Sequence, residues 1–286
     1  MLSKILTLLI VIVAVFGVAA VSVPATAGAA DCTETVTYLT NPAPEWDAYR
    51  ARLNADVTGL DAFWAEAYPQ QFGGTFTTPC VYEYIPAEVP FQQTCGVTPE
   101  IATSNAFYCV PEHVVMWDGP TFFQPLYLEL GDAALTFIVA HEYGHAAQFL
   151  SGEIPARSVN REFQADCYAG AYLQYAEEQG IITEEDYREI VAVVAFVGQS
   201  RIGSTWFTRT HPTALQREAA MFTGYQNGVA GCQVDFARLY NIQEAAESGE
   251  LRDAVEDAVE DGPLREAVEE GNITPPERPR PAPRRP

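Results

Sequence analysis

His141, Glu142 and His145 form the pattern His-Glu-x-x-His inside an apolar stretch of the chain. Residues four apart lie on one face of an α-helix, so both imidazoles can bind one metal ion. The glutamate that follows the first histidine can take a proton from water beside that metal. The chain has four histidines, and this motif uses two of them. The pattern therefore predicts a zinc site that hydrolyses peptide bonds.

A zinc site of this type needs a third protein ligand and an open position for water. Glu162 and Asp166 are the candidates, because they lie four residues apart on a helix whose other residues are largely apolar. Carboxylates on a buried helix face are costly unless they are paired or bound to metal. We predict that Glu162 is the third ligand and that Asp166 accepts a hydrogen bond from a ligand histidine. The reverse assignment is the alternative.

The predicted mechanism gives Glu142 the role of general base, which later delivers its proton to the leaving amine. Negative charge that develops on the substrate oxygen needs a further donor. His211, which precedes Pro212, is the candidate donor, and a structural loop histidine is the alternative. The competing function is a non-catalytic or latent envelope protein, whose zinc is structural or capped by His211.

The net charge of the chain and the types of its candidate metal ligands limit which partners and which metal we expect it to bind. The formal net charge of −22 argues against nucleic acid and against an anionic membrane surface. Two imidazoles and a carboxylate suit Zn2+ better than other common divalent metals. The expected cofactor is therefore zinc, and the expected partner is a protein or peptide substrate.

The first 30 residues resemble an export signal, with Lys4 followed by an uncharged apolar run and small residues. An uncleaved membrane anchor is the alternative, and the membrane is a partner only in that case. Six cysteines follow, which in an exported chain suggest up to three disulfides. We expect a secreted or cell-envelope protein.

Hydrophobic periodicity predicts a mainly helical α+β fold with a small β-rich N-terminal portion. One domain is expected over residues 31–245, followed by an acidic helical appendage over 246–274 and a disordered Pro/Arg-rich tail over 275–286. The expected elements of the domain are a helix at 45–67, short strands at 70–118, and helices at 132–150, 160–179, 183–197 and 211–222.

Around the motif the chain resembles the bacterial neutral zinc metallopeptidases. The matching strings are Asn105–Cys109, Val139–His145, Glu162–Gly170 and Thr210-His211. The resemblance runs from about Leu60 to Tyr225, and it implies a zincin-like core with Glu162 as a ligand and His211 near the metal. It also implies a disulfide between Cys95 and Cys109.

Three features depart from the family pattern. Ala146 stands where the family usually has a second histidine after the motif, Glu162 follows His145 by only 17 residues, and Pro212 stands where the family usually has glycine. The short connection leaves the size of the substrate open. Zincins commonly hold an extended substrate along a strand edge, and the strand at Val114–Asp118 is the sequence-based candidate for that edge.

Overall fold

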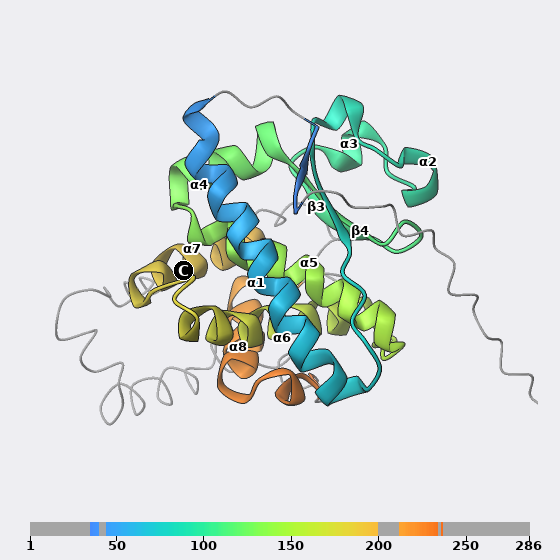
Figure 1. Ribbon diagram of the computed structural model, residues 1–286, viewed down its shortest axis with the longest axis vertical. Coiled ribbons are helices and arrows are strands. Elements are labelled where there is room, and N and C mark those ends of the chain that lie inside the picture. Colours follow the sequence, from blue (N-terminus) through green and yellow to red (C-terminus); the bar gives the residue numbers. More distant parts are fainter. Residues whose placement is uncertain (1–34, 40–43, 200–211, 234–235, 237–286) are drawn as a thin grey trace, which may run out of the picture.

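The computed structural model describes residues 35–39, 44–199, 212–233 and 236. The predicted export signal, His211, the acidic appendage and the C-terminal tail lie outside the described residues. Figure 1 shows the long helices packed together on one side, with the strands and the short helices α2 and α3 on the other. The mainly helical α+β fold predicted from the sequence is confirmed.

Within the described residues, five long helices form most of the fold, and short helical turns connect the strands. The long helices are α1 (Asp47–Phe72), α5 (Ala133–Ser151), α6 (Ser158–Glu178), α7 (Tyr187–Gln199) and α8 (Ala214–Asn227). The shorter ones are η1 (Pro44–Trp46), η2 (Pro86–Glu88), α2 (Gln92–Cys95), α3 (Pro99–Ala102), η3 (Gly119–Phe123), α4 (Gln124–Leu130), η4 (Glu184–Asp186) and η6 (Val229–Cys232). The sequence did not predict α4.

Local signals set the ends of the long helices. Gly152 ends α5 with a φ of 71°, a left-handed conformation that glycine adopts without steric cost. Thr213 begins α8, where its side chain accepts a hydrogen bond from the backbone N–H of Gln216 and the Gln216 side chain returns to Thr213. This reciprocal capping satisfies N–H groups that the first helical turn leaves free.

In the part of the chain that the structure describes, the sheet has four strands in the order β1-β2-β4-β3. Strands β1 (Thr37–Tyr38), β2 (Cys80–Tyr84) and β4 (Val114–Asp118) run parallel, and β3 (Ala106–Cys109) pairs antiparallel with β4. The prediction that Val114–Asp118 forms the edge is therefore wrong. All five residues of β4 are buried, because it lies between β2 and β3, and β3 is the edge strand on that side.

Alternate residues of β4 face two different apolar layers. Val115 and Trp117 belong to the main core with α1, α5 and α6. Val114 and Met116 belong to a smaller cluster with Val97 and Ala102, beneath α2 and α3. Burial on both faces explains why this strand is a continuous apolar run rather than an alternating one.

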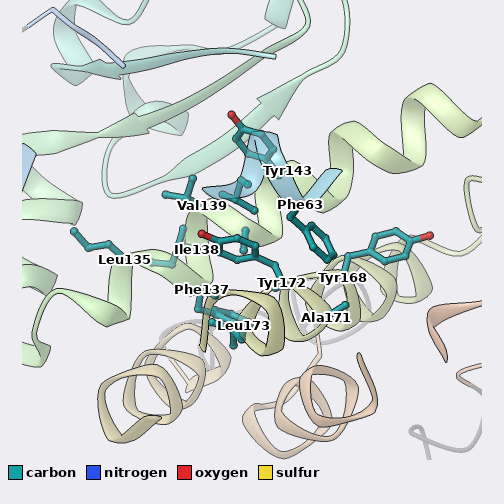
Figure 2. Close-up of a cluster of buried hydrophobic side chains, with 14 of the residues drawn as sticks. Phe63, Leu135, Phe137, Ile138, Val139, Tyr143, Tyr168, Ala171, Tyr172 and Leu173 are labelled. Atoms are coloured by element: carbon teal, nitrogen blue, oxygen red, sulfur yellow. The ribbon is translucent and has the colours of Figure 1, made fainter. Parts of the chain in front are cut away.

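Large apolar side chains of α1, α5 and α6 form much of the main core. Phe63 of α1 packs against Tyr172 of α6, with ring centroids 5.7 Å apart, and Phe137 and Tyr143 of α5 belong to the same core (Figure 2). A helix that is apolar on nearly every side is buried in a domain core. α5 fits that description and carries the His-Glu-x-x-His motif through the interior.

Small residues let α6 approach its neighbours closely. A Cβ added at Gly170 would lie 1.8 Å from the backbone oxygen of Met221, and one added at Gly224 would lie 1.7 Å from that of Cys167. On the other side of α6, Gly144 of α5 faces Ala165. These contacts set the spacing between α5, α6 and α8, and hence between the side chains they carry.

Replacing Gly224 with alanine is expected to lower the free energy of unfolding by about 3 kcal/mol, the upper part of the usual range for overpacking. The cause is a clash with backbone, which cannot rotate away as a side chain can. Gly152→Ala is the matched control, since open space surrounds Gly152 and only its left-handed φ is penalised, at about 1 kcal/mol. Denaturant unfolding measures both; an equal loss in the two variants would contradict this packing account.

Disulfides join Cys95 to Cys109 and Cys167 to Cys232. The first is the pair implied by the family resemblance, and it anchors the end of β3. Cys80 is also disulfide-bonded. Within the described residues, the helices lack the combination of length and apolar content needed to cross a lipid bilayer.

Candidate metal centre and active site

His141 and His145 of α5 face Glu162 of α6 across one small space. The Nε2 atom of His141 lies 3.5 Å from Oε2 of Glu162, and that of His145 lies 3.6 Å from Oε1. One potential ligand atom from each residue lies within 4.8 Å of the other two. The structure thus brings together the three residues that the sequence predicts as metal ligands, while Asp166 stands behind them.

Asp166 holds the ring of His141. Its Oδ1 atom lies 2.8 Å from Nδ1 of His141 and accepts a hydrogen bond from Nη1 of Arg217 at 2.7 Å. A carboxylate only accepts hydrogen bonds, so Nδ1 of His141 carries a proton, and in the neutral form of the ring, which binds metals, Nε2 is the unprotonated nitrogen. The lone pair of Nε2 is then directed at the space shared with Glu162, as a metal ligand requires.

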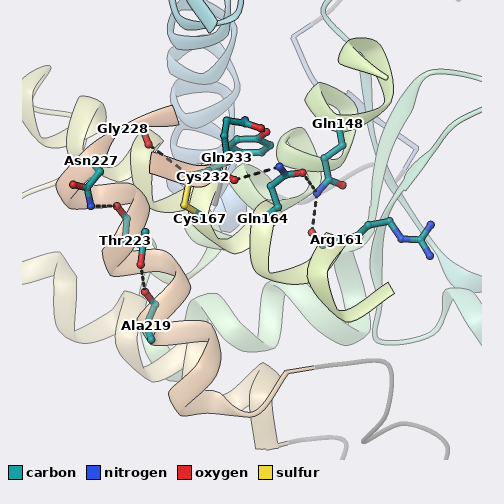
Figure 3. The surroundings of a disulfide bond; sticks show 11 residues. Gln148, Arg161, Gln164, Cys167, Ala219, Thr223, Asn227, Gly228, Cys232 and Gln233 are labelled. Atoms are coloured by element: carbon teal, nitrogen blue, oxygen red, sulfur yellow. Dashed lines mark hydrogen bonds between the residues drawn. A yellow bond between two sulfur atoms is a disulfide. The ribbon is translucent and has the colours of Figure 1, made fainter. Parts of the chain in front are cut away.

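His145 is oriented by a chain of amides. The Gln148 side chain donates from Nε2 to the backbone oxygen of Arg161 at 2.8 Å and to Oε1 of Gln164 at 3.0 Å. Its own Oε1 atom is therefore left to accept from Nδ1 of His145, 3.0 Å away. Gln164 is itself fixed, because it donates to the backbone oxygen of Cys232 (Figure 3). Because Nδ1 of His145 donates its proton to Gln148, the neutral ring has its lone pair on Nε2, where it can bind a metal.

Replacing Gln148 with leucine is expected to weaken zinc binding about 10- to 100-fold, the usual effect of removing a group that orients a ligand. Leucine keeps the bulk but leaves Nδ1 of His145 without an acceptor. Gln174→Leu is the control, because Gln174 on α6 donates an exposed hydrogen bond to Glu178 and does not line the pocket. Competition titration with a chromogenic chelator measures the affinity; equal zinc binding by both variants would contradict the orienting role.

Electrostatics at this site favour a cation. Burial alone would lower the pKa of His141, but the carboxylates of Asp166 and Glu162 outweigh it and raise the pKa to about 10. For Glu162 the effects are reversed. Burial alone would raise its pKa, but hydrogen bonding to His141 and the charges of His145 and Arg217 hold the pKa well below its usual range. Two ionised carboxylates that stabilise positive charge on an imidazole stabilise a divalent metal for the same reason.

The donor set therefore fits zinc. Two imidazole nitrogens and one carboxylate are a common ligand set for catalytic zinc, which keeps a further position open. A structural zinc is usually closed by four protein ligands. Within the described residues the group contains three ligands, which agrees with the open type.

Glu142 lies in the same pocket as this group. The pocket has a volume of about 460 Å³ and is lined by Glu142, the three candidate ligands, and residues 105–108 in and beside β3. Glu142 is 7% exposed, and no hydrogen bond joins its side chain to the described residues. Its carboxylate is therefore available to a water molecule or a substrate in the pocket.

Sequence reasoning missed three residues of this site: Gln148, Gln164 and Arg217. Arg217 is 6% exposed and bridges Asp166 to Glu162, whose Oε2 atom lies 3.4 Å from Nη2. It lies on the buried side of α8 with Ala220, Met221 and Gly224. An arginine on an apolar stripe signals buried carboxylate partners, and this signal was present in the sequence.

His211 lies outside the described residues, so its role as a donor stays a prediction. Thr213, two residues later, caps the N-terminus of α8, and α8 carries Arg217 into the pocket.

Comparisons with known proteins agree with this site. Residues 2–156 match the model of the family described as "Putative neutral zinc metallopeptidase". This match includes His141, Glu142 and His145 and ends before Glu162. No solved structure matches the chain significantly.

Relatives occur in mycobacteria and enterobacteria. The uncharacterized proteins Mb2605 of Mycobacterium bovis and Rv2575 of Mycobacterium tuberculosis are each 29% identical over 228 residues, which cover 65% of this chain and 74% of the relative. The uncharacterized protein YpfJ of Escherichia coli is 28% identical over 158 residues, which cover 47% of this chain and 54% of YpfJ. Because the family model matches more than half of the sequence and includes the His-Glu-x-x-His motif, the chain belongs to this zinc metallopeptidase family.

Proposed function

We propose that this protein is an exported zinc-dependent endopeptidase with Glu142 as the general base. One observation carries the proposal: His141, His145 and Glu162 converge on a single point, and Glu142 lines the same pocket. Each histidine also has its Nδ1 atom beside a side-chain oxygen. A buried cluster with only a structural role would not need that orientation of both rings.

The roles of the residues follow from their positions. His141, His145 and Glu162 would hold the zinc ion, and Asp166 and Gln148 would keep the two rings in the ligand orientation. When bound, zinc supplies Lewis acidity and makes water acidic enough to lose a proton near neutral pH. Glu142 would accept that proton on its carboxylate and pass it to the leaving amine.

The edge strand β3 supports a peptide as substrate. Among the described residues β3 pairs only with β4, so its outer edge can hydrogen-bond to an added strand. Residues 105–108 of this edge line the pocket. A substrate that extends along β3 would pass the metal with chain on both sides, as internal cleavage requires. This corrected edge replaces β4 in the predicted binding mode.

Export is supported by the cysteines. The two disulfides are stable in oxidising compartments and rare in the cytosol. Together with the signal-like first 30 residues, they favour a secreted or cell-envelope location. Detection of the protein in the medium or the envelope fraction, shortened by its N-terminal segment, tests this part.

The test of activity uses purified protein and an unfolded substrate such as reduced, alkylated lysozyme. Hydrolysis should disappear with a chelator and return with added zinc. A protein that binds one zinc ion and leaves the substrate intact would instead support the latent or non-catalytic alternative.

A further inference from the structure

Three apolar side chains are exposed at the mouth of the pocket. Val110, Phe149 and Ile154 are 40%, 37% and 45% exposed, and all three line the pocket. We call these three residues the apolar rim. They are three of the nine large apolar side chains that are exposed in the described part of the chain. Isolated exposed apolar residues are ordinary, but several around one pocket indicate a binding surface.

The apolar rim is built from three separate segments. Phe149 lies on α5 at four residues after His145, so the two side chains share a helix face. Val110 directly follows β3, and Ile154 lies in the connection between α5 and α6. The ring of Phe149 also contacts that of Tyr108 on β3, with centroids 6.3 Å apart. The rim thus joins the metal-bearing helix to the end of the edge strand.

The distance between the apolar rim and the candidate metal ligands is similar to the length of a short stretch of extended peptide. Four residues of α-helix advance about 6 Å, and an extended chain advances about 3.3 Å per residue. A substrate lying along β3 would therefore place a side chain on the rim about two residues from the bond that is cleaved.

Further apolar side chains line the pocket. They are Phe122, Phe137 and Ile138, and the ring centroid of Phe137 lies 6.3 Å from that of His141. Polar side chains outside the candidate centre, Asn105, Ser158 and Arg161, line the pocket too. Apolar contact with the rim is therefore one available means of selecting a substrate side chain.

We propose that the apolar rim is a specificity subsite for a large aliphatic or aromatic side chain within about two residues of the cleaved bond. This inference rests on the proposed function and names its substrate class. Folded proteins bury such side chains, whereas unfolded chains expose them. The rim would thus direct the enzyme to unfolded or partly unfolded polypeptides.

The first experiment compares cleavage sites in reduced, alkylated lysozyme for the wild type, Phe149→Ser and Leu128→Ser, using mass spectrometry. Leu128 is the matched control, because it is 71% exposed on α4 and does not line the pocket. The wild type and Leu128→Ser should cleave preferentially beside large apolar residues. Kinetics on two peptides that differ in one residue, phenylalanine or serine, give a second readout. The ratio of kcat/KM for the phenylalanine peptide to kcat/KM for the serine peptide should be about tenfold lower in Phe149→Ser than in the wild type, the lower end of what a missing apolar contact changes.

A second experiment separates this inference from the proposed catalysis. Glu142→Gln is used to bind two fluorescent peptides that differ in one central residue, phenylalanine or serine. The phenylalanine peptide should bind about tenfold more tightly, and adding Phe149→Ser should remove that difference. Binding selectivity without hydrolysis by the wild type would overturn the proposed catalysis but support the subsite. Hydrolysis with no apolar preference, or with a preference that Phe149→Ser does not change, would overturn the subsite.

Discussion

Glu142→Gln will reduce hydrolysis of an unfolded protein about 10²- to 10⁴-fold, the usual contribution of a general base. Glutamine fills the same space as glutamate but cannot take a proton from water. The candidate ligands remain in place, because no hydrogen bond links the Glu142 side chain to the described residues. Zinc affinity should therefore stay within a fewfold of the wild type, and the loss should appear in kcat rather than KM.

Two further variants serve as controls for Glu142→Gln. Glu153→Gln, which lies just after α5 and does not line the pocket, should behave as the wild type. Glu162→Gln should lose both activity and zinc, because it removes a ligand rather than the base. If Glu142→Gln retained a tenth or more of the wild-type rate, another group would have to move the proton.

Short-range sequence patterns indicated which side chains of the candidate site share a helix face. The spacing of His141 and His145 fixes their shared helix face, and the spacing of Glu162 and Asp166 does the same on α6. Helical geometry relates these pairs regardless of the rest of the fold. The structure adds that both pairs meet, since Gly144 allows α6 to pass close to α5 at Ala165.

The same reasoning could not predict which elements lie next to each other in the fold. An apolar run indicated that Val114–Asp118 is a strand, but strand periodicity does not encode which strands become neighbours. The edge strand is β3, whose four residues give a weaker strand pattern in the sequence. Gln148 and Gln164 were missed for a related reason: a buried glutamine is informative only when its partners are known, and its partners come from different elements.

The disulfide between Cys167 and Cys232 is expected to contribute about 4 kcal/mol to the free energy of unfolding. The two cysteines are 65 residues apart, and closing a loop of that length in the unfolded chain accounts for this value in the chain-entropy estimate. Both cysteines are fully buried. Cys167→Ala combined with Cys232→Ala should lower the denaturant midpoint accordingly, measured without metal so that zinc binding adds nothing.

The same double variant should also weaken zinc binding, which distinguishes this disulfide from the one between Cys95 and Cys109. Cys232 supplies the backbone oxygen that holds Gln164, and Gln164 in turn fixes Gln148 beside His145. Freeing the η6 turn from α6 loosens the first step of that chain.

Cys95→Ala combined with Cys109→Ala is the matched comparison. That disulfide spans only 14 residues, so its removal should cost about 3 kcal/mol, and no hydrogen bond among the described residues links it to the ligand histidines. If both double variants bound zinc as the wild type does, the amide chain would be structural only. If only the variant lacking Cys167 and Cys232 bound zinc more weakly, the η6 turn would be part of the metal centre although it contributes no ligand.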